Sequence, residues 1–255
     1  MTLGTRSKFY YGHNVTESNY YMNFSESSVE KTAQLDLGDY TPTEFAIELA
    51  KQMNAVGGQT YSVSFSRTTR KITISAASNF DLDITSGTNA GTSIYTLAGF
   101  TGSDSTAATS HVGNLVSGSE FKPQFYLQKY IDFEDNQSAA FSSIAKSASG
   151  NVESYSFGSE KIAEFNLVLQ TDNAQGSGNP IETDASGVAN LRTFMEYVTN
   201  KRKFEFMKDR DTVASFKKCI LESSGKSKDG VAFRLDDTKM AGYYTAGKLT
   251  LREIS

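Results

Sequence analysis

The stretch Thr41-Pro42-Thr43-Glu44-Phe45 decides the fold of the first half of the chain. A threonine can cap the first turn of a helix, and a proline suits the first helical position. A glutamate three residues after the cap completes a capping box. Thr41, Pro42 and Glu44 occupy these positions in order. The stretch therefore predicts a helix that begins directly after Thr41.

Apolar residues continue this helix with a period of four. Phe45, Leu49 and Met53 fall on one helical face, and Gly57-Gly58 ends the pattern. Such spacing is typical of an amphipathic helix, and a glycine pair is a common point of termination. We interpret the apolar stripe as a face that packs into a hydrophobic core.

Period-two patterns follow the helix. Residues 61–65 alternate apolar and polar side chains, residues 66–70 are polar, and residues 72–74 alternate again. This is the pattern of a β-hairpin, and residues 80–84 predict a third strand by the same rule. We therefore predict a compact α+β module with its own small core over about residues 36–102.

Two flanking stretches connect this module to the rest of the chain. Residues 8–35 alternate aromatic and polar positions, which predicts two short strands around a turn at Gly12-His13-Asn14. Residues 101–119 are dominated by Ser, Thr, Gly and Ala, as expected of a link that returns the chain from the module. The apolar residues Val112, Leu115 and Val116 in this link allow part of it to pack as an edge strand.

The second half of the chain returns mainly to strands. Short alternating segments recur from residue 121 onward, with a helix predicted over about residues 185–199. The Ala/Ser-rich residues 136–150 and the polar residues 172–183 read as loops.

These patterns predict a mainly β fold with minor α (α+β). The predicted architecture is an antiparallel β-sandwich or barrel core with a small inserted α+β module. The core domain is expected to combine residues 1–35 and 117–255. The inserted module, with its Ser/Thr/Gly-rich return linker, is expected to span residues 36–116.

Composition narrows the classes of function. The 255 residues include 25 Lys+Arg against 29 Asp+Glu, a formal net charge of −4, which argues against nucleic-acid binding through a basic face. One cysteine and two histidines leave no disulfide framework and no Cys/His zinc site. No apolar stretch is long enough to span a bilayer, and residues 1–8 lack the apolar run of a secretory signal. We therefore expect synthesis in a cytoplasm without signal-directed export.

The sequence offers few residues for catalysis or metal binding. His13 and His111 lie in polar, turn-like segments and are interpreted as solvated loop histidines, and Cys219 as a buried structural thiol. The acidic stretches 81–83 and 132–136 lack the spacing of an EF-hand. No phosphate-binding loop pattern occurs. We predict no catalytic residue, no cofactor and no metal ligand.

One combination of segments resembles a module of virion proteins of tailed bacteriophages, in which a Gly-x-Tyr-Thr motif precedes a helix, a hairpin and a Leu-Gly-Phe motif. In this sequence Ala98 separates Leu97 from Gly99, a small departure from that pattern. The C-terminal half looks like phage tail-tip proteins of the distal-tail type. The segments that carry the two resemblances are 35–50, 61–65, 70–74 and 97–101 for the module, and 121–124, 204–209 and 242–244 for the C-terminal half.

The resemblance implies a protein without enzymatic activity that forms a ring, commonly a hexamer, between the tail tube and the tail tip or baseplate. Its partners would be further copies of itself and other tail proteins of the tube, hub and fibres, and its location would be the virion. Aromatic side chains are favoured at subunit interfaces, and the chain has 17 Phe and 13 Tyr. The candidate interface residues are Tyr10, Tyr11, Tyr243 and Tyr244.

Two other classes of function stay open at this point. The module could read a host receptor or glycan at the tail tip, in which case it should carry an aromatic, polar-lined groove. A hydrolase of cell-wall polymers would need paired carboxylates in a cleft, which spacing along the sequence does not reveal.

Overall fold

The protein is mainly β, with antiparallel sheets in sandwich-like layers and few helices, as predicted from the sequence. Within the residues that the structure describes, no sheet closes into a barrel, so the sandwich alternative holds. The structure is a computed structural model. It describes residues 8–121, 134–138, 142–146, 149, 152–156, 160–167, 170–171, 191–207, 216–224, 236–237, 243–245 and 247–254.

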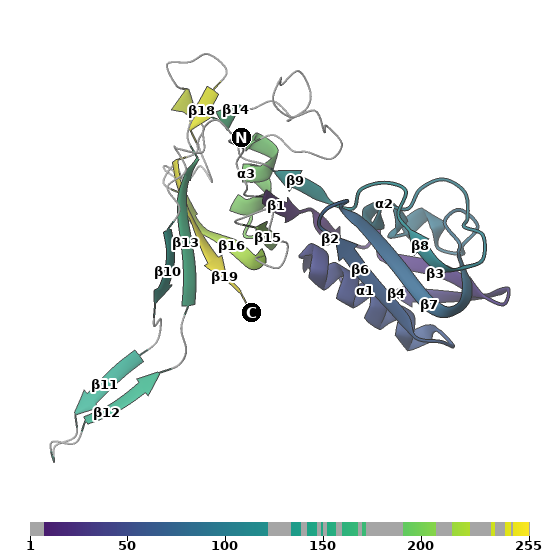
Figure 1. Cartoon of the computed structure of the whole chain (residues 1–255), viewed down its shortest axis with the longest axis horizontal. Coiled ribbons are helices and arrows are strands. Elements are labelled where there is room, and N and C mark those ends of the chain that lie inside the picture. The colour runs from purple at the N-terminus through teal and green to yellow at the C-terminus, as the bar shows by residue number, and fades with distance from the viewer. Residues whose placement is uncertain are drawn as a thin grey trace.

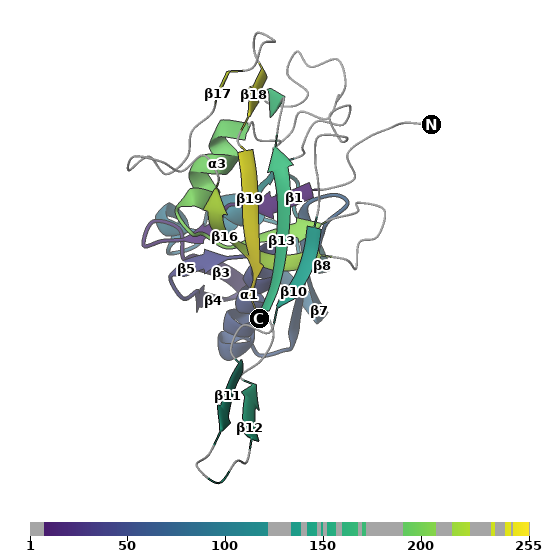
Figure 2. The ribbon, with the colours of Figure 1, turned by 90° about the vertical axis from the view of Figure 1, so that its left-hand side faces the viewer.

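One seven-stranded antiparallel sheet organises most of the second half of the chain (Figures 1 and 2). We call this sheet and the elements that follow residue 118 the large-sheet region. The strands, in spatial order, are β10 (Glu134–Ser138), β13 (Glu160–Leu167), β19 (Gly247–Glu253), β16 (Phe216–Ser224), β15 (Phe204–Met207), β1 (Lys8–Tyr11) and β9 (Ser119–Phe121).

Smaller elements surround this sheet. The hairpin β11 (Ser142–Lys146) and β12 (Val152–Ser156) extends beyond the end of β10 and β13 in both views. Short strands β14 (Gln170–Thr171), β17 (Asp236–Asp237) and β18 (Tyr243–Thr245) form a separate ribbon. The stretch 136–150, predicted as a loop, thus contains the end of β10 and all of β11. Its Ala and Ser residues carry no strong strand pattern.

The helix α3 (Leu191–Thr199) supplies buried apolar side chains to the large-sheet core. Residues 185–190 of the predicted helix lie outside the described residues. Cys219 is buried in this core, as predicted for a structural thiol. The core is strongly aromatic and comprises Phe9, Tyr11, Phe121, Phe194, Met195, Tyr197, Val198, Phe204, Phe206, Cys219, Leu221, Leu249 and Leu251.

A second body, which we call the module, comprises residues 12–118 and lies to one side of the large sheet (Figure 1). Its main sheet has β3 (Tyr21–Glu26) between β4 (Val29–Gln34) and the long strand β7 (Lys71–Leu82), which also pairs with β6 (Tyr61–Ser66) and β8 (Ala108–Val112). The remaining elements are β2 (His13–Val15), β5 (Gly38–Tyr40), α1 (Pro42–Val56), the short 3-10 turn η1 (Ala90–Thr92) and α2 (Tyr95–Ala98).

The helix α1 forms as its sequence predicts. The Thr41 hydroxyl accepts a hydrogen bond from the Glu44 amide at 3.2 Å, and the Glu44 carboxylate accepts one from the Thr41 amide at 3.1 Å, which completes the capping box. The predicted stripe of Phe45, Leu49 and Met53 is fully buried. The helix ends before Gly57.

Residues 13–35 pack with the module, whereas the sequence-based boundary assigned residues 1–35 to the core domain. β3 pairs with β7, and Met22, Phe24 and Leu35 belong to the hydrophobic cluster of the module. The physical reason is register: Phe24 lies opposite Leu82 and alternates onto the same buried face. Of the described residues 8–35, only those of β1 join the large sheet.

The chain passes between the two regions at two neighbouring glycines. Gly12 and Gly118 both have positive φ, +96° and +68°. A Cβ on Gly118 would lie 2.3 Å from the His13 ring and 2.7 Å from the Tyr11 carbonyl oxygen, so no larger residue fits there. β1 and β9, which flank these crossings, pair with each other.

The module corrects two local predictions and confirms a third. The predicted turn at residues 12–14 is a bend at Gly12 followed by strand β2, so His13 lies in a strand. The predicted third strand at 80–84 is the end of the single long strand β7, which reaches Leu82. The link 101–119 contains an edge strand, β8, as its apolar residues allowed. No helix among the described residues is long and apolar enough to cross a membrane.

Candidate functional site

The module meets the large sheet on the opposite face from the aromatic core. Along β1, β9 and β15, side chains alternate between the two faces. Phe9, Phe121 and Phe206 point into the core. Their neighbours in sequence, Tyr10, Glu120 and Glu205, therefore point to the other face. Tyr10 is directly opposite Glu205 on one side and Glu120 on the other. The fold thus places two carboxylates on either side of one phenol. We call these three side chains, together with the module residues that contact them, the joint.

Glu205 is the centre of one half of the joint. Its carboxylate is fully buried and accepts hydrogen bonds from the Thr43 amide and from Arg67 Nε, both at 2.9 Å. Arg67 also donates to the Thr43 hydroxyl at 2.6 Å. Because Thr43 lies in the first turn of α1, the carboxylate meets the positive end of the helix dipole as well as a guanidinium.

Glu120 is the centre of the other half. It pairs with Arg70 Nε and with Lys8 Nζ, each at 3.1 Å, and all three side chains are mostly buried. Arg70 ends the turn between β6 and β7 with a positive φ of 55°. Its carbonyl oxygen accepts the Ser117 amide at 2.7 Å. The turn predicted at 66–70 therefore carries both arginines of the joint.

Tyr10 connects the two halves. Its hydroxyl donates to the Arg67 carbonyl oxygen at 3.0 Å, and its ring lies edge-on to Phe65. Burial raises the pKa of Tyr10, and the negative charge of Glu120 raises it further. The phenol therefore remains a protonated donor at every physiological pH.

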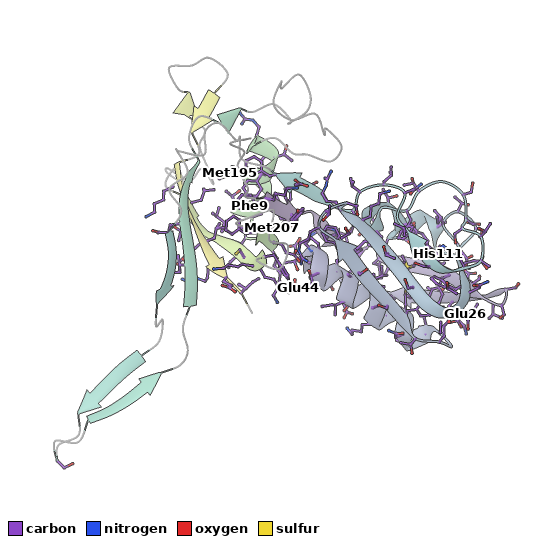
Figure 3. The ribbon with its side chains drawn as sticks, viewed as in Figure 1. Phe9, Glu26, Glu44, His111, Met195 and Met207 are labelled. Carbon is purple, nitrogen blue, oxygen red and sulfur yellow. The ribbon has the colours of Figure 1, made fainter. Side chains whose placement is uncertain are left out.

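The rim of the joint is also charged. The Glu44 carboxylate lies 3.4 Å from Nζ of both Lys203 and Lys218 of the large-sheet region. Figure 3 shows Glu44 at the end of the module nearest the large sheet. Burial opposes ionisation of Glu44. The Thr41 amide and the two lysines outweigh that effect, so that the pKa of Glu44 is lowered. The Glu44 side chain thus caps α1 and connects it to Lys218 of β16 and to Lys203, the residue before β15.

His13 corrects the prediction of a solvated histidine. Its ring is fully buried beside Phe45 and Phe65, and Nε2 lies 2.9 Å from the Ser117 hydroxyl. Ser117 donates its one hydroxyl proton to the Leu97 carbonyl oxygen, so His13 Nε2 must be the donor in the first contact. Burial lowers the pKa of His13 to about 3, which keeps the ring neutral.

His111 is also buried, in contrast to its prediction. Its Nε2 lies 2.8 Å from the Phe80 carbonyl oxygen, and its ring contacts Phe80 edge-on. Figure 3 shows His111 on the module, away from the joint. The two imidazoles therefore do not come together, because β2 and β8 lie in different parts of the module.

The candidate interface residues fall into two groups. Tyr10 and Tyr11 are buried within the chain, Tyr10 in the joint and Tyr11 in the large-sheet core against Tyr197. Their rings contact this chain and offer no surface to another copy, which corrects their expected role. Tyr243 and Tyr244 lie in β18, and their side chains are outside what the structure describes.

The joint is suited to fixing the orientation of the module relative to the large sheet. Its buried charges are each opposed by a partner, and replacing a buried pair with apolar residues is often energetically neutral, so such pairs define geometry more than they add stability. Sequence reasoning missed the joint, although a glutamate between two phenylalanines in Phe204-Glu205-Phe206 is a signal of a strand with a polar second face. In the described part of the chain, no three His, Cys, Asp or Glu side chains gather as a metal ion would require.

Comparison of the sequence with models of known protein families found no match. A comparison with curated proteins likewise found no similar sequence.

Proposed function

We propose that this protein is a non-enzymatic structural component of a bacteriophage tail, which forms a homo-oligomeric ring between the tail tube and the tail tip or baseplate. The family assignment rests on the sequence resemblance. The observation that supports a role in a ring is that the two ends of the molecule differ in structure and are held together by a rigid connection.

The rigid connection is the joint. Two crossings of the chain, two buried arginine–glutamate pairs and the first turn of α1 all hold the module on the same face of β1, β9 and β15. A module on a flexible linker would not need buried, directional contacts of this kind. A ring component has to present its contact surfaces at one angle in every copy, which this connection provides.

The two ends differ in structure. One end carries the module, and the other ends at β10, whose outer edge pairs with no strand among the described residues (Figure 1). A head-to-tail ring needs two different complementary surfaces on each copy, because each interface joins one end to the other. An open strand edge is a ready site for such pairing.

The hairpin β11–β12 adds a second contact element at that end. Its two strands pair only with each other within the described residues, and it extends beyond the large sheet (Figures 1 and 2). An isolated two-stranded hairpin is marginally stable in water, so it gains order by packing on a neighbour. In a ring, that neighbour is the next copy.

The test is native mass spectrometry with negative-stain imaging over a range of concentrations. We expect a closed ring of one copy number, and the resemblance predicts six. A chain that stays monomeric at high concentration contradicts the proposal.

A shortened variant sharpens this test. Ser138 and Glu160 lie directly opposite each other in β10 and β13, so an Asn-Gly turn can replace residues 139–159 without moving either strand. We expect this variant to keep its circular dichroism spectrum and to lose the ring. A variant that still forms the parental ring would rule out the hairpin as a contact.

A second candidate function is glycan binding by the module at the tail tip. The specific observation in its favour is a neutral, hydroxyl-lined pocket beside β8. Its test is sugar binding by the full chain, which is independent of ring formation.

A further inference from the structure

Residues 101–114 form a loop that is closed at its base. The Thr101 amide donates to the Asn114 side-chain oxygen at 2.9 Å, and the Asn114 side-chain amide donates to the Thr101 carbonyl oxygen at 2.7 Å. The Leu115 amide donates to the Gly99 carbonyl oxygen one step further out. A Cβ on Gly99 would lie 2.6 Å from the Leu115 carbonyl oxygen, so the closure needs glycine at this position.

A second anchor fixes the middle of the loop. The Asp104 carboxylate accepts hydrogen bonds from the Thr85 amide at 2.6 Å and from the Ser86 amide at 3.2 Å. A hydrogen bond from the Ser86 side chain and the bonds from these amides lower the pKa of Asp104 to about 2, so the anchor is charged at neutral pH. The loop is thus held at its base, at Asp104 and along β8, and its shape is formed before any ligand arrives.

The held loop borders a pocket of about 390 Å³ that is open to solvent. We call it the loop pocket. That volume lies near the lower end of the range for small-molecule sites and suits one or two sugar rings. Five of its twelve lining residues carry hydroxyl groups, and five are apolar, among them Leu82 at the end of β7 and Phe100 just before the loop. His111 and Asn114 complete the lining.

None of the twelve lining residues is charged. Two carboxylates lie nearby, Asp104 in the loop and Asp83 just after β7, and the negative charge of Asp104 acts on Asp83. A cationic ligand would find no carboxylate in the wall, and an anionic ligand would find no cation there and these two acids close by. The chemistry of the wall therefore favours a neutral ligand.

Several polar groups of the wall are not used within the protein. The Ser103 and Thr106 hydroxyls make no hydrogen bond to any residue that the structure describes, and both residues are exposed. His111 is more than nine-tenths buried and uses Nε2 as a donor to Phe80, which leaves Nδ1 as an acceptor with no partner in the described chain. Each of these groups can bond a ligand without breaking a bond of the fold.

An exposed apolar side chain completes the site. Val112 lines the loop pocket and is 58% exposed. Sugars combine hydroxyl groups with apolar C–H faces, so a wall that mixes free hydroxyls, an imidazole acceptor and an exposed valine is complementary to them. An apolar ligand would desolvate the hydroxyls without replacing their bonds to water.

We propose that the loop pocket binds a neutral sugar unit of a glycan. Ser103, Thr106 and His111 Nδ1 supply the hydrogen bonds, and Val112 contacts the C–H face of the ring. The proposal deepens the second candidate function and does not rest on the ring, because the loop pocket lies within one copy of the module.

The test uses the full-length chain and saturation-transfer NMR with free neutral hexoses and N-acetylhexosamines, and with neutral oligosaccharides built from them. Glucuronate serves as the anionic comparison, and a neutral extended peptide tests whether the open edge of β8 adds a strand instead. We expect transfer to at least one neutral sugar and none to glucuronate or the peptide.

Two variants locate the site. Ser103→Ala combined with Thr106→Ala removes two hydrogen bonds and should weaken sugar binding about tenfold. Thr109→Ala is the matched control, because Thr109 is exposed on the same strand as Ser110 and does not line the loop pocket. It should bind sugar as the parent chain does.

Each other result overturns the proposal. Absence of binding to every neutral sugar, or equal binding by the double variant and Thr109→Ala, shows that the loop pocket is not a sugar site. Binding of glucuronate or of the peptide in its place assigns the pocket to another ligand class. Ring formation is measured separately, so its failure does not affect this outcome.

Discussion

The joint, where the module meets the large sheet, and the loop pocket, within the module, treat polar side chains in opposite ways. The joint buries charged side chains and gives each an opposite charge, as Glu205 with Arg67 and Glu120 with Arg70. The loop pocket contains no charge and leaves hydroxyls without partners in the described chain. The difference distinguishes the two regions: the charges of the joint are paired within the chain, whereas the loop pocket keeps hydroxyls that the described chain does not use.

The largest expected effect comes from breaking the joint on one side. Glu205→Leu removes the carboxylate and leaves the Arg67 guanidinium, whose side chain is 12% exposed, without its charged partner. Loss of one member of a buried pair typically costs about 3–5 kcal/mol of unfolding free energy. Urea unfolding at neutral pH measures this loss.

The double variant Arg67→Met with Glu205→Leu gives the decisive contrast. Because neither charge is then buried alone, we expect it to recover most of the lost stability. Lys51→Ala is the control, since Lys51 pairs with Asp36 on the exposed surface, and it should cost less than about 1 kcal/mol. A double variant no more stable than Glu205→Leu would show that the pair matters by more than its charge.

The next largest effect is a loss of folding stability at acidic pH. The pKa of His13 is about 3 in the folded chain and 6.5 in the unfolded chain, so below pH 6.5 the unfolded state binds a proton that the folded state does not. The stability contributed by neutral His13 is complete above that pH and falls as pH decreases toward 3. The slope is up to about 1.4 kcal/mol per pH unit.

His13→Gln isolates this contribution. Gln keeps a donor that can reach the Ser117 hydroxyl and does not titrate. The measurement is urea unfolding of both chains between pH 7 and about pH 4.5, a range chosen because most carboxylates remain ionised there. The parent chain should lose stability faster than His13→Gln, and parallel pH profiles would contradict the burial argument.

Local signals explain what could be predicted from the sequence. Thr41, Pro42 and Glu44 define the start of α1 because a capping box is satisfied within four residues. The hairpin of β6 and β7 was predictable for the same reason, since its alternation is read along a short segment.

Features that depend on distant contacts were not predictable. His13 and Ser117 meet at the crossings of the chain, and the polar pattern around each gives no sign of burial. Residues 13–35 belong to the module because Phe24 lies opposite Leu82, a pairing that the sequence does not display. The loop pocket lies in a stretch rich in Ser, Thr and Gly, whose composition is equally typical of a linker.

A smaller effect is expected at the cap of α1. Thr41→Ala removes the side-chain acceptor of the Glu44 amide and should cost about 1 kcal/mol of unfolding free energy. Thr41→Ser keeps the hydroxyl and should restore most of it. Chemical unfolding of the two variants checks the difference, and equal losses would mean that the methyl group, not the cap, is responsible.

The smallest effect on stability is expected at the loop pocket. The Thr106 hydroxyl makes no hydrogen bond within the described chain and the residue is exposed, so Thr106→Ala should change the unfolding free energy by less than about 0.5 kcal/mol. Chemical unfolding checks this value beside that of Glu205→Leu. A large loss would mean that Thr106 already serves the fold, which would remove it from the groups free to bind a sugar. A negligible loss leaves its hydroxyl available, which is the property that separates the loop pocket from the joint.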